Sequence, residues 1–286
     1  MATGKVTKDK IAKQYFCLAN PWAMRGNFML KKMDTRYLGR LVKQYLPITV
    51  VVYTIAFIAL MSSCFVISGN SVASYKIEIW TWACEYVDFF LPLIATLPFA
   101  IVVYLQKRNH FIRYASVRMR KNSYIRYHVA AGMILSFSAT WLIYFLSLVI
   151  TEFFVPIFNQ GYGSDLENYV FGSYQIHSPL LFGALWCGWK GINAACFTLF
   201  AYMLALYVDN IFLINVLPFL YCMAENLVTA LLEIPDYSII TSYVLNRLTP
   251  SCMHVWNYLI GTVSFLVAAS CIVLFLKGKS VIEYES

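Results

Sequence analysis

Charged residues are scarce in this sequence. The 286 residues include 22 Lys and Arg and 14 Asp and Glu, a charged share of 13%. So few charges cannot cover the surface of a water-soluble protein of this length, whereas lipid accepts an apolar exterior. An aromatic share of 17% excludes an intrinsically disordered chain. The composition therefore predicts a protein whose main solvent is a lipid bilayer.

The residue patterns of common catalytic and metal sites are also missing. No Gly-x-Ser-x-Gly motif occurs, and the histidines are scattered over loops without the spacing of metal ligands. Gly278-Lys279-Ser280 matches the end of a phosphate-binding loop, but the glycine required five positions earlier is Val273. We therefore expect no catalytic residue, no metal site, no bound cofactor and no ATP hydrolysis by this chain alone. The four histidines are His110, His128, His177 and His254.

Long apolar runs dominate the rest of the chain. A transmembrane helix needs about 20 mostly apolar residues. The run Gly191–Leu232 is too long for one crossing, because as a single helix it would exceed a core of about 30 Å twofold. Asp209 and Asn210 lie near its middle and predict a turn between helices over about 191–208 and 210–232. With the four other runs, the sequence predicts an all-α membrane protein with six transmembrane helices. The other runs are Leu46–Ser68, Phe89–Leu105, Val129–Ile150 and Val255–Leu276.

The basic residues predict the orientation of these helices. The two termini and the 106–128 loop hold 19 of the 22 Lys and Arg, while the loops on the other face hold only Lys76, Lys190 and Arg247. Because basic residues stay on the cytoplasmic side, both termini should be cytoplasmic. A nucleic-acid partner is not expected, since the charges flank apolar spans. The expected parts of the single domain, 1–286, are an N-terminal segment (1–45), a six-helix membrane bundle (46–276) and a tail (277–286).

An amphipathic helix is expected before the first span. Over residues 28–45, apolar side chains recur at three- and four-residue intervals with Lys and Arg between them, which suits a helix lying in the cytoplasmic interface. Pro47 follows and fits the first turn of a new helix. The pattern fits equally well a simple topology anchor and an elbow helix that braces a transporter.

The 106–128 loop is basic and partly apolar. Phe111, Ile112 and Tyr114 alternate with arginines, which predicts a short helix with one apolar face. Such a helix could dock into a groove on a soluble partner. A solvated loop that only determines topology is the alternative.

Two segments on the other face are expected to be irregular. Residues 151–189 read as an exposed loop, in which Leu180–Trp189 is apolar but too short to span. Residues 233–254 suggest a re-entrant or interfacial helix pair, which is tolerated at membrane depth only when packed against protein.

Glu225 is the clearest ionisable residue inside a predicted span, and Asn226 is beside it. An intramembrane carboxylate often faces a cavity, so both residues are candidates for a translocation path. A hydrogen bond that only packs helices is the slightly favoured alternative, because no basic partner is evident nearby. Asp88, Glu152 and Asp209 are expected at span ends, where exposure to water requires no function.

Three sequence patterns together resemble the ABC-2 type permeases of bacterial ABC exporters. After the basic amphipathic segment comes Phe-Phe-Leu-Pro-Leu-Ile-Ala-Thr-Leu-Pro-Phe-Ala over 89–100, and Leu217-Pro218-Phe219 occurs in the fifth span. The third pattern is Arg113-x-x-x-x-Arg118-x-x-Lys121-x-x-Tyr124-Ile125. The similarity extends over the whole chain in topology, but its motifs are loose patterns of residue type.

The resemblance implies a permease subunit in a bacterial cytoplasmic membrane. It would pair with a second copy or a related permease, and with separate ABC ATPase subunits that bind ATP and magnesium. Residues 28–45 would be its elbow helix and 233–254 its outer re-entrant region. The coupling helix that contacts the ATPase would include Phe111, Arg113, Tyr114, Arg118, Lys121 and Tyr124.

One feature departs from the family. Related permeases often carry an acidic residue and a glycine just after the second span, where this chain has Gln106-Lys107-Arg108-Asn109-His110. The implied cargo is a peptide, an antimicrobial, a drug or a lipid. Two other classes remain open: a membrane protein that works without nucleotide, such as a channel or a bacteriocin-immunity protein, and a membrane-bound enzyme, which the missing catalytic residues disfavour.

Overall fold

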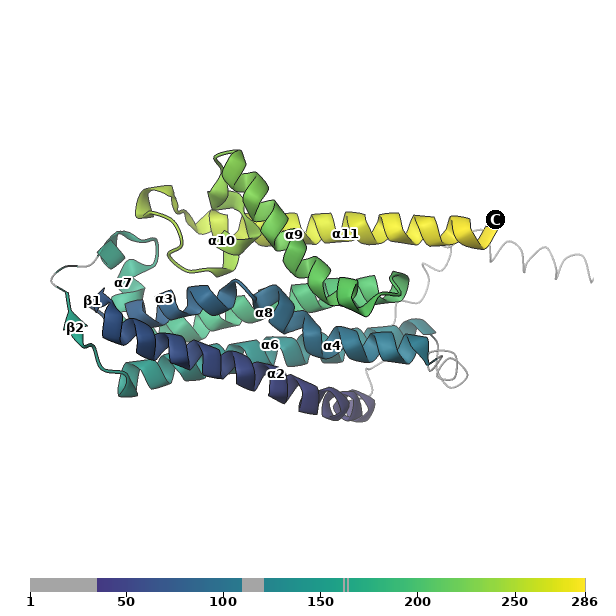
Figure 1. Ribbon diagram of the computed structural model, residues 1–286, viewed down its shortest axis with the longest axis horizontal. Helices are drawn as coiled ribbons and strands as arrows, with labels where there is room; N and C mark the ends of the chain where they lie inside the picture. Colours follow the sequence, from purple (N-terminus) through teal and green to yellow (C-terminus); the bar gives the residue numbers. More distant parts are fainter. Residues whose placement is uncertain (1–34, 110–120, 162, 164, 286) are drawn as a thin grey trace, which may run out of the picture. The chain divides into compact units, whose positions relative to one another are not determined.

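The computed structural model describes residues 35–109, 121–161, 163 and 165–285, and helices account for most of them (Figure 1). In chain order the elements are α2 (Thr35–Asn70), β1 (Val72–Ala73), α3 (Lys76–Asp88), α4 (Leu91–Arg108), α6 (Lys121–Phe154), β2 (Asn159–Gln160), η1 (Asp165–Asn168), α7 (Gly172–His177), α8 (Pro179–Tyr207), α9 (Ile211–Leu231), η2 (Pro235–Tyr237), α10 (Ile239–Tyr243), η3 (Pro250–Cys252) and α11 (Val255–Glu285).

Six helices are long and apolar enough to cross a membrane, which confirms the predicted all-α fold with six spans. They are α2, α4, α6, α8, α9 and α11. Large apolar side chains such as Ile55, Leu227 and Val267 are more than half exposed on this bundle. Lipid tails, rather than water, are the suitable solvent for such a surface.

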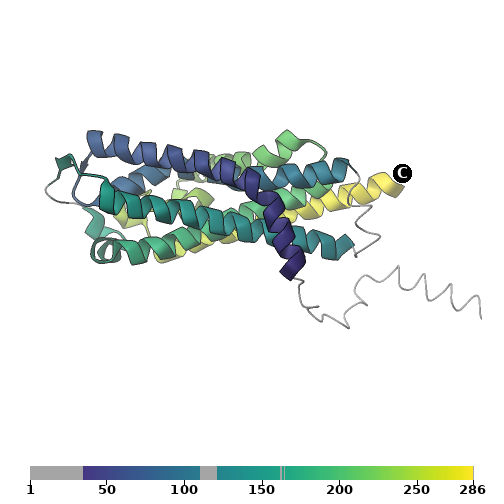
Figure 2. The same cartoon turned by 90° about the horizontal axis from the view of Figure 1, so that it is seen from below.

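The first span is part of one continuous helix. We predicted an amphipathic helix over 28–45 that ends before Pro47, but α2 runs through Pro47 without interruption. Residues 28–34 lie outside the described part of the chain. Buried side chains on both sides of the proline, Tyr45 and Tyr53, hold α2 against α6, so the helix continues despite one lost hydrogen bond. α2 is bent in Figure 2, and we attribute this bend to Pro47.

The second span is preceded by a separate helix. α3 ends at Asp88, and α4 begins at Leu91 with a proline in its first turn, so Phe89 and Phe90 form a break between two helices that follow each other end to end (Figure 1). α4 also extends to Arg108, three residues beyond the predicted span. The apolar run of this region predicted the second span, whereas no pattern in the sequence predicted α3.

α8 is the centre of the bundle. It packs most extensively against α6 and α4, and it begins at Pro179. The expected loop over Leu180–Trp189 is therefore wrong, because these residues are the first turns of a long, largely buried helix. The predicted turn before α9 is confirmed: the Asn210 side chain caps α9 by accepting hydrogen bonds from the amides of Phe212 and Leu213.

A short parallel pairing joins the ends of α2 and α6. β1 follows α2 and β2 follows α6, and Val72 pairs with Asn159. The Ser68 hydroxyl donates to the carbonyl of Pro156, and the Asn159 amide donates to the carbonyl of Gly69 at 3.2 Å. We call this group of contacts the β tie.

The 233–254 segment re-enters the bundle. It contains one five-residue α-helix, α10, and two 3-10 turns, rather than the predicted helix pair. Residues 238–245 are all buried. α10 packs on Gly261 of α11, which lies about 9 Å inside the span that begins at Val255. The irregular backbone is thus covered by protein at membrane depth, as the lack of water there requires.

Candidate functional site

A buried ion pair lies at the break between α3 and α4. Lys190 of α8 and Asp88 are joined by an N–O distance of 2.5 Å, and both side chains have no exposed surface. The Lys190 ammonium also lies 4.3 Å from the ring centroid of Tyr144 on α6. These contacts bring α3, α6 and α8 together at one point.

The sequence predicted other positions for both Asp88 and Lys190. Asp88 was expected to be exposed at a span end, and Lys190 to belong to a loop on the outer face. Removing one charge from water at this depth is expensive, but the opposite charge and the aromatic ring offset much of that expense. The available sequence signal was a single lysine in the otherwise uncharged run from Pro179 to Tyr207.

Glu225 anchors the re-entrant segment. Its carboxylate accepts a hydrogen bond from the Ser238 hydroxyl at 2.9 Å and from the Ile239 amide at 3.1 Å. The Ser238 hydroxyl in turn accepts from the Ile240 amide, as an N-cap does. The carboxylate therefore accepts hydrogen bonds at the start of α10, which is the helix-packing role expected as the alternative to a translocation path.

Arg247 supplies the basic group that the local sequence around Glu225 lacks. Its guanidinium donates to the Asn226 side-chain oxygen at 2.7 Å and to the Thr241 hydroxyl at 3.0 Å. Asn226 is thus directly bonded to the re-entrant segment, while Glu225 interacts with Arg247 electrostatically. Arg247 follows Glu225 by more than twenty residues, so no local pattern relates them.

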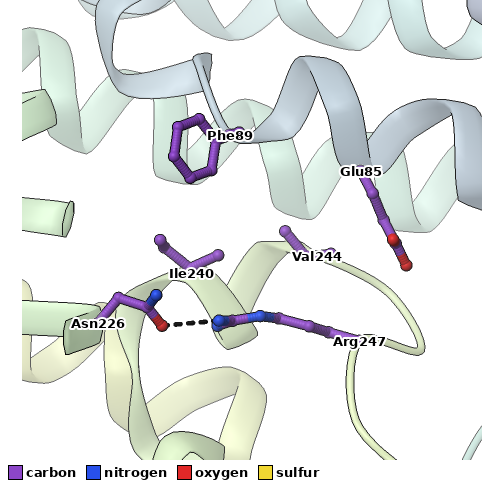
Figure 3. A pocket seen from close by; sticks show the side chains of 6 residues that line it. All are labelled: Glu85, Phe89, Asn226, Ile240, Val244 and Arg247. Carbon is purple, nitrogen blue, oxygen red and sulfur yellow. Dashed lines mark hydrogen bonds between the residues drawn. The ribbon is translucent and has the colours of Figure 1, made fainter. Parts of the chain in front are cut away.

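A pocket of about 190 Å³ lies between α3, α9 and α10. Figure 3 shows Glu85 and Phe89 on one wall and Asn226, Ile240, Val244 and Arg247 on the others. Glu85 and Arg247 are not among the salt bridges of the described residues. They therefore present opposite charges to the same cavity.

Glu85 has an unusual ionisation. It belongs to α3, outside the six apolar spans, and its side chain is partly open to solvent, so the surrounding protein displaces only part of the water around its carboxyl group. This desolvation, followed in importance by the negative charge of Asp88, raises the pKa of Glu85 to about 7. Lys190 and Arg247 act in the opposite direction. We therefore expect the charge of Glu85 to change near neutral pH.

Most of the predicted coupling helix lies outside the described residues. This applies to Phe111, Arg113, Tyr114 and Arg118. Lys121 is the first residue of α6. Tyr124 is inside α6, buried, and donates a hydrogen bond to the Gln106 side chain of α4 at 2.9 Å.

Tyr124 adjoins a buried polar cluster where α4 ends and α6 begins. Its ring lies 4.3 Å from that of His128 in a tilted arrangement, and the Tyr45 hydroxyl lies 2.7 Å from Nδ1 of His128. The Tyr202 hydroxyl donates to that of Tyr45 at 2.6 Å. The approach of Tyr202 requires Gly132, since a Cβ there would lie 2.7 Å from the ring. Four spans, α2, α4, α6 and α8, are linked in this way at the end next to the 110–120 segment.

Searches for related proteins give no assignment. No family model, curated protein or solved structure matches this chain. Within the described residues, no three His, Cys, Asp or Glu side chains are grouped to hold a metal ion. A function must therefore be inferred from the pocket, the re-entrant segment and the sequence patterns.

The anchoring role of Glu225 is testable by substitution. We expect Glu225→Ala to lower the free energy of unfolding by about 2 kcal/mol, because the Ser238 and Ile239 donors lose a charged acceptor. The measurement is the thermal unfolding midpoint of the purified protein in detergent. Glu167→Ala, which removes an exposed carboxylate, should leave the midpoint unchanged. A stable Glu225→Ala protein that has lost transport would instead favour a direct role in the translocation path.

Proposed function

We propose that this chain is the transmembrane permease subunit of an ATP-driven ABC exporter of the ABC-2 type. In this proposal it is a multi-pass protein of a bacterial cytoplasmic membrane with both termini in the cytoplasm. It pairs with a second copy or a related permease, and separate ABC ATPase subunits bind ATP and magnesium and perform the hydrolysis. The cargo is a peptide, an antimicrobial or another amphipathic compound.

The observation that carries the proposal is the charged pocket beside α10. Ionisable side chains and irregular backbone at membrane depth are expensive, and in membrane proteins they commonly mark the path of a transported substance. Here Arg247 of the re-entrant segment bonds Asn226 of the α9 span, and Glu85 of α3 lies on the opposite wall of the same pocket, next to the break that ends α3. The re-entrant segment before the last span also agrees with the resemblance found in the sequence.

The described contacts indicate how motion would reach the pocket. The segment 110–120, expected to contact the ATPase, joins α4 to α6. The cluster of Tyr124, His128 and Tyr202 links the adjoining helix ends, while the Asp88–Lys190 pair links α3 to α8 near the pocket. A tilt of α4 produced by the ATPase would therefore be transmitted along α4 and α8. The permease itself would only bind and release cargo, with affinities that differ between its conformations.

The decisive experiment is co-purification with the ATPase. The tagged chain, expressed with its candidate ATPase partner, should retain that subunit, and the complex should hydrolyse ATP. We expect the double variant Phe111→Ala/Arg118→Ala to weaken this association by about tenfold or more while the protein remains in the membrane, because an apolar anchor and a charge are both lost.

A matched control removes the same side-chain types from α2. Arg40→Ala/Leu46→Ala eliminates one exposed cation and one exposed apolar residue and should retain the ATPase. If Phe111→Ala/Arg118→Ala binds the ATPase as strongly as the unmodified chain does, the assignment of the coupling segment is wrong. A protein that is active without any ATPase would favour the alternative, a nucleotide-independent channel or immunity protein.

A further inference from the structure

We propose that the pocket between α3, α9 and α10 binds a zwitterionic group, with its anionic part on Arg247, its cationic part facing Glu85 and an apolar remainder outside the cavity. This inference deepens the proposed function and depends on it, because it names the chemistry of the substance that enters the path.

The guanidinium group of Arg247 is suited to binding an anion. A guanidinium has five N–H donors arranged to match a carboxylate or phosphate. Only two donor contacts are made within the described part of the chain, to Asn226 and Thr241, and these hold the group in one orientation. These two contacts use fewer than half of the five donors, and Arg247 lines the pocket.

The charges around Arg247 disfavour a simple anion. Glu85 lies on the opposite wall, and Glu225 is close enough to interact with the guanidinium. A ligand with only negative charge is repelled by these carboxylates, and a ligand with only positive charge is repelled by Arg247. A ligand that carries both charges satisfies both walls.

The size and walls of the pocket limit what enters it. A volume of about 190 Å³ accommodates one headgroup-sized moiety and not a folded peptide. Phe89, Ile240 and Val244 form apolar walls. Phe89 is 41% exposed and lies 5.8 Å from the ring of Phe219, so an apolar surface continues beyond the pocket. A zwitterionic headgroup on an apolar body fits this arrangement, whether it belongs to a phospholipid or to a free amphiphile.

Native mass spectrometry of the protein in maltoside detergent can test the ligand class. The probes are phosphatidylethanolamine and phosphatidylglycerol with identical short acyl chains, which differ in the presence of the ammonium group. We expect the unmodified protein to bind phosphatidylethanolamine about tenfold more tightly, since only this lipid also pairs with Glu85. Equal affinities for the two lipids would overturn the proposal.

Substitutions separate the two walls. Glu85→Gln should remove the preference between the lipids, whereas Arg247→Lys, which keeps the charge but loses the fork of donors, should weaken the binding of both. Glu167→Gln and Arg40→Lys are the matched controls outside the pocket and should keep the preference. Thermal unfolding midpoints establish that each variant is folded. An unchanged preference in folded Glu85→Gln contradicts the proposed role of that carboxylate.

The pH dependence gives an independent readout. The charges that act on Glu85 are those of Asp88 on its own helix, of Lys190 on α8 and of Arg247, and its pKa is raised to about 7. Because only the ionised carboxyl attracts the ammonium group, the preference for phosphatidylethanolamine should fall as the pH decreases below 7 and should be insensitive to pH in Glu85→Gln. A preference that stays constant across this range contradicts the proposal.

A competition experiment identifies the source of the ligand, and the combined results show whether the ligand class or the permease assignment is wrong. Glycerophosphoethanolamine, which has the headgroup without acyl chains, should compete if the natural ligand is a free zwitterion, and should not compete if the apolar body of a lipid is required. If the ATPase co-purifies but the two lipids bind equally, the ligand class is wrong and the permease assignment stands. If the lipid preference is found but no ATPase associates, the permease assignment fails while the pocket chemistry stands.

Discussion

Replacing Lys190 by methionine should destabilise the protein by about 3–5 kcal/mol, because the substitution leaves the Asp88 carboxylate buried without its cation. The methionine fills most of the volume of the lysine stem, so the loss reports on charge rather than on a cavity. The measurement is the thermal unfolding midpoint in detergent, together with the yield of monodisperse protein in size-exclusion chromatography.

A second substitution distinguishes charge from packing. In Asp88→Leu/Lys190→Met neither charge remains, so most of the lost stability should return. The surface pair provides the matched control: Lys107 bonds Asp209 at 2.8 Å with side-chain exposures of 28% and 84%, and Lys107→Met should reduce stability by about 0–1 kcal/mol. If the double variant is no more stable than Lys190→Met, the pair contributes through shape and not through charge neutralisation.

Gly261→Ala should have the next largest effect. A Cβ at this position would overlap the Ser242 hydroxyl and would lie 2.6 Å from the carbonyl oxygen of Ser238 and 2.9 Å from Cα of Ile239. Two of these three neighbours are backbone atoms, so α10 must move away from α11. We expect a loss of about 1–3 kcal/mol from overpacking, and with it the loss of the pocket, whose wall includes Ile240 of α10.

The control for this substitution is another helical glycine with open space around it. No atom lies within 4 Å of a Cβ built at Gly39, and Gly39→Ala should stabilise α2 by about 0.5–1 kcal/mol through the better helix propensity of alanine. Unfolding midpoints and the phosphatidylethanolamine preference are measured for both variants. A Gly261→Ala protein that keeps both properties would show that α10 is not held closely against α11.

The features that were predicted correctly depend on local composition. Five apolar runs, one of them long enough for two helices, produced six spans. The polar pair at Asp209 and Asn210 located the turn before α9, because Asn210 caps that helix. Both hydrophobic spans and helix caps can be predicted from a short stretch of sequence.

The errors concern residues whose partners are distant in sequence. Lys190 indicated a loop because an unpaired lysine is costly inside a membrane, and its partner Asp88 is 102 residues away. Glu225 lacked a nearby base because Arg247 enters on the re-entrant segment. The pocket could not be predicted for the same reason, since α3, α9 and α10 meet only after the chain has folded.

The β tie restricts how the bundle can change shape. Because Val72 pairs with Asn159 and Ser68 bonds the carbonyl of Pro156, the ends of α2 and α6 cannot separate without breaking several bonds at once. α2 and α6 should therefore move together, because they are joined at one end. Any widening of the bundle should begin elsewhere, among α9, α10 and α11.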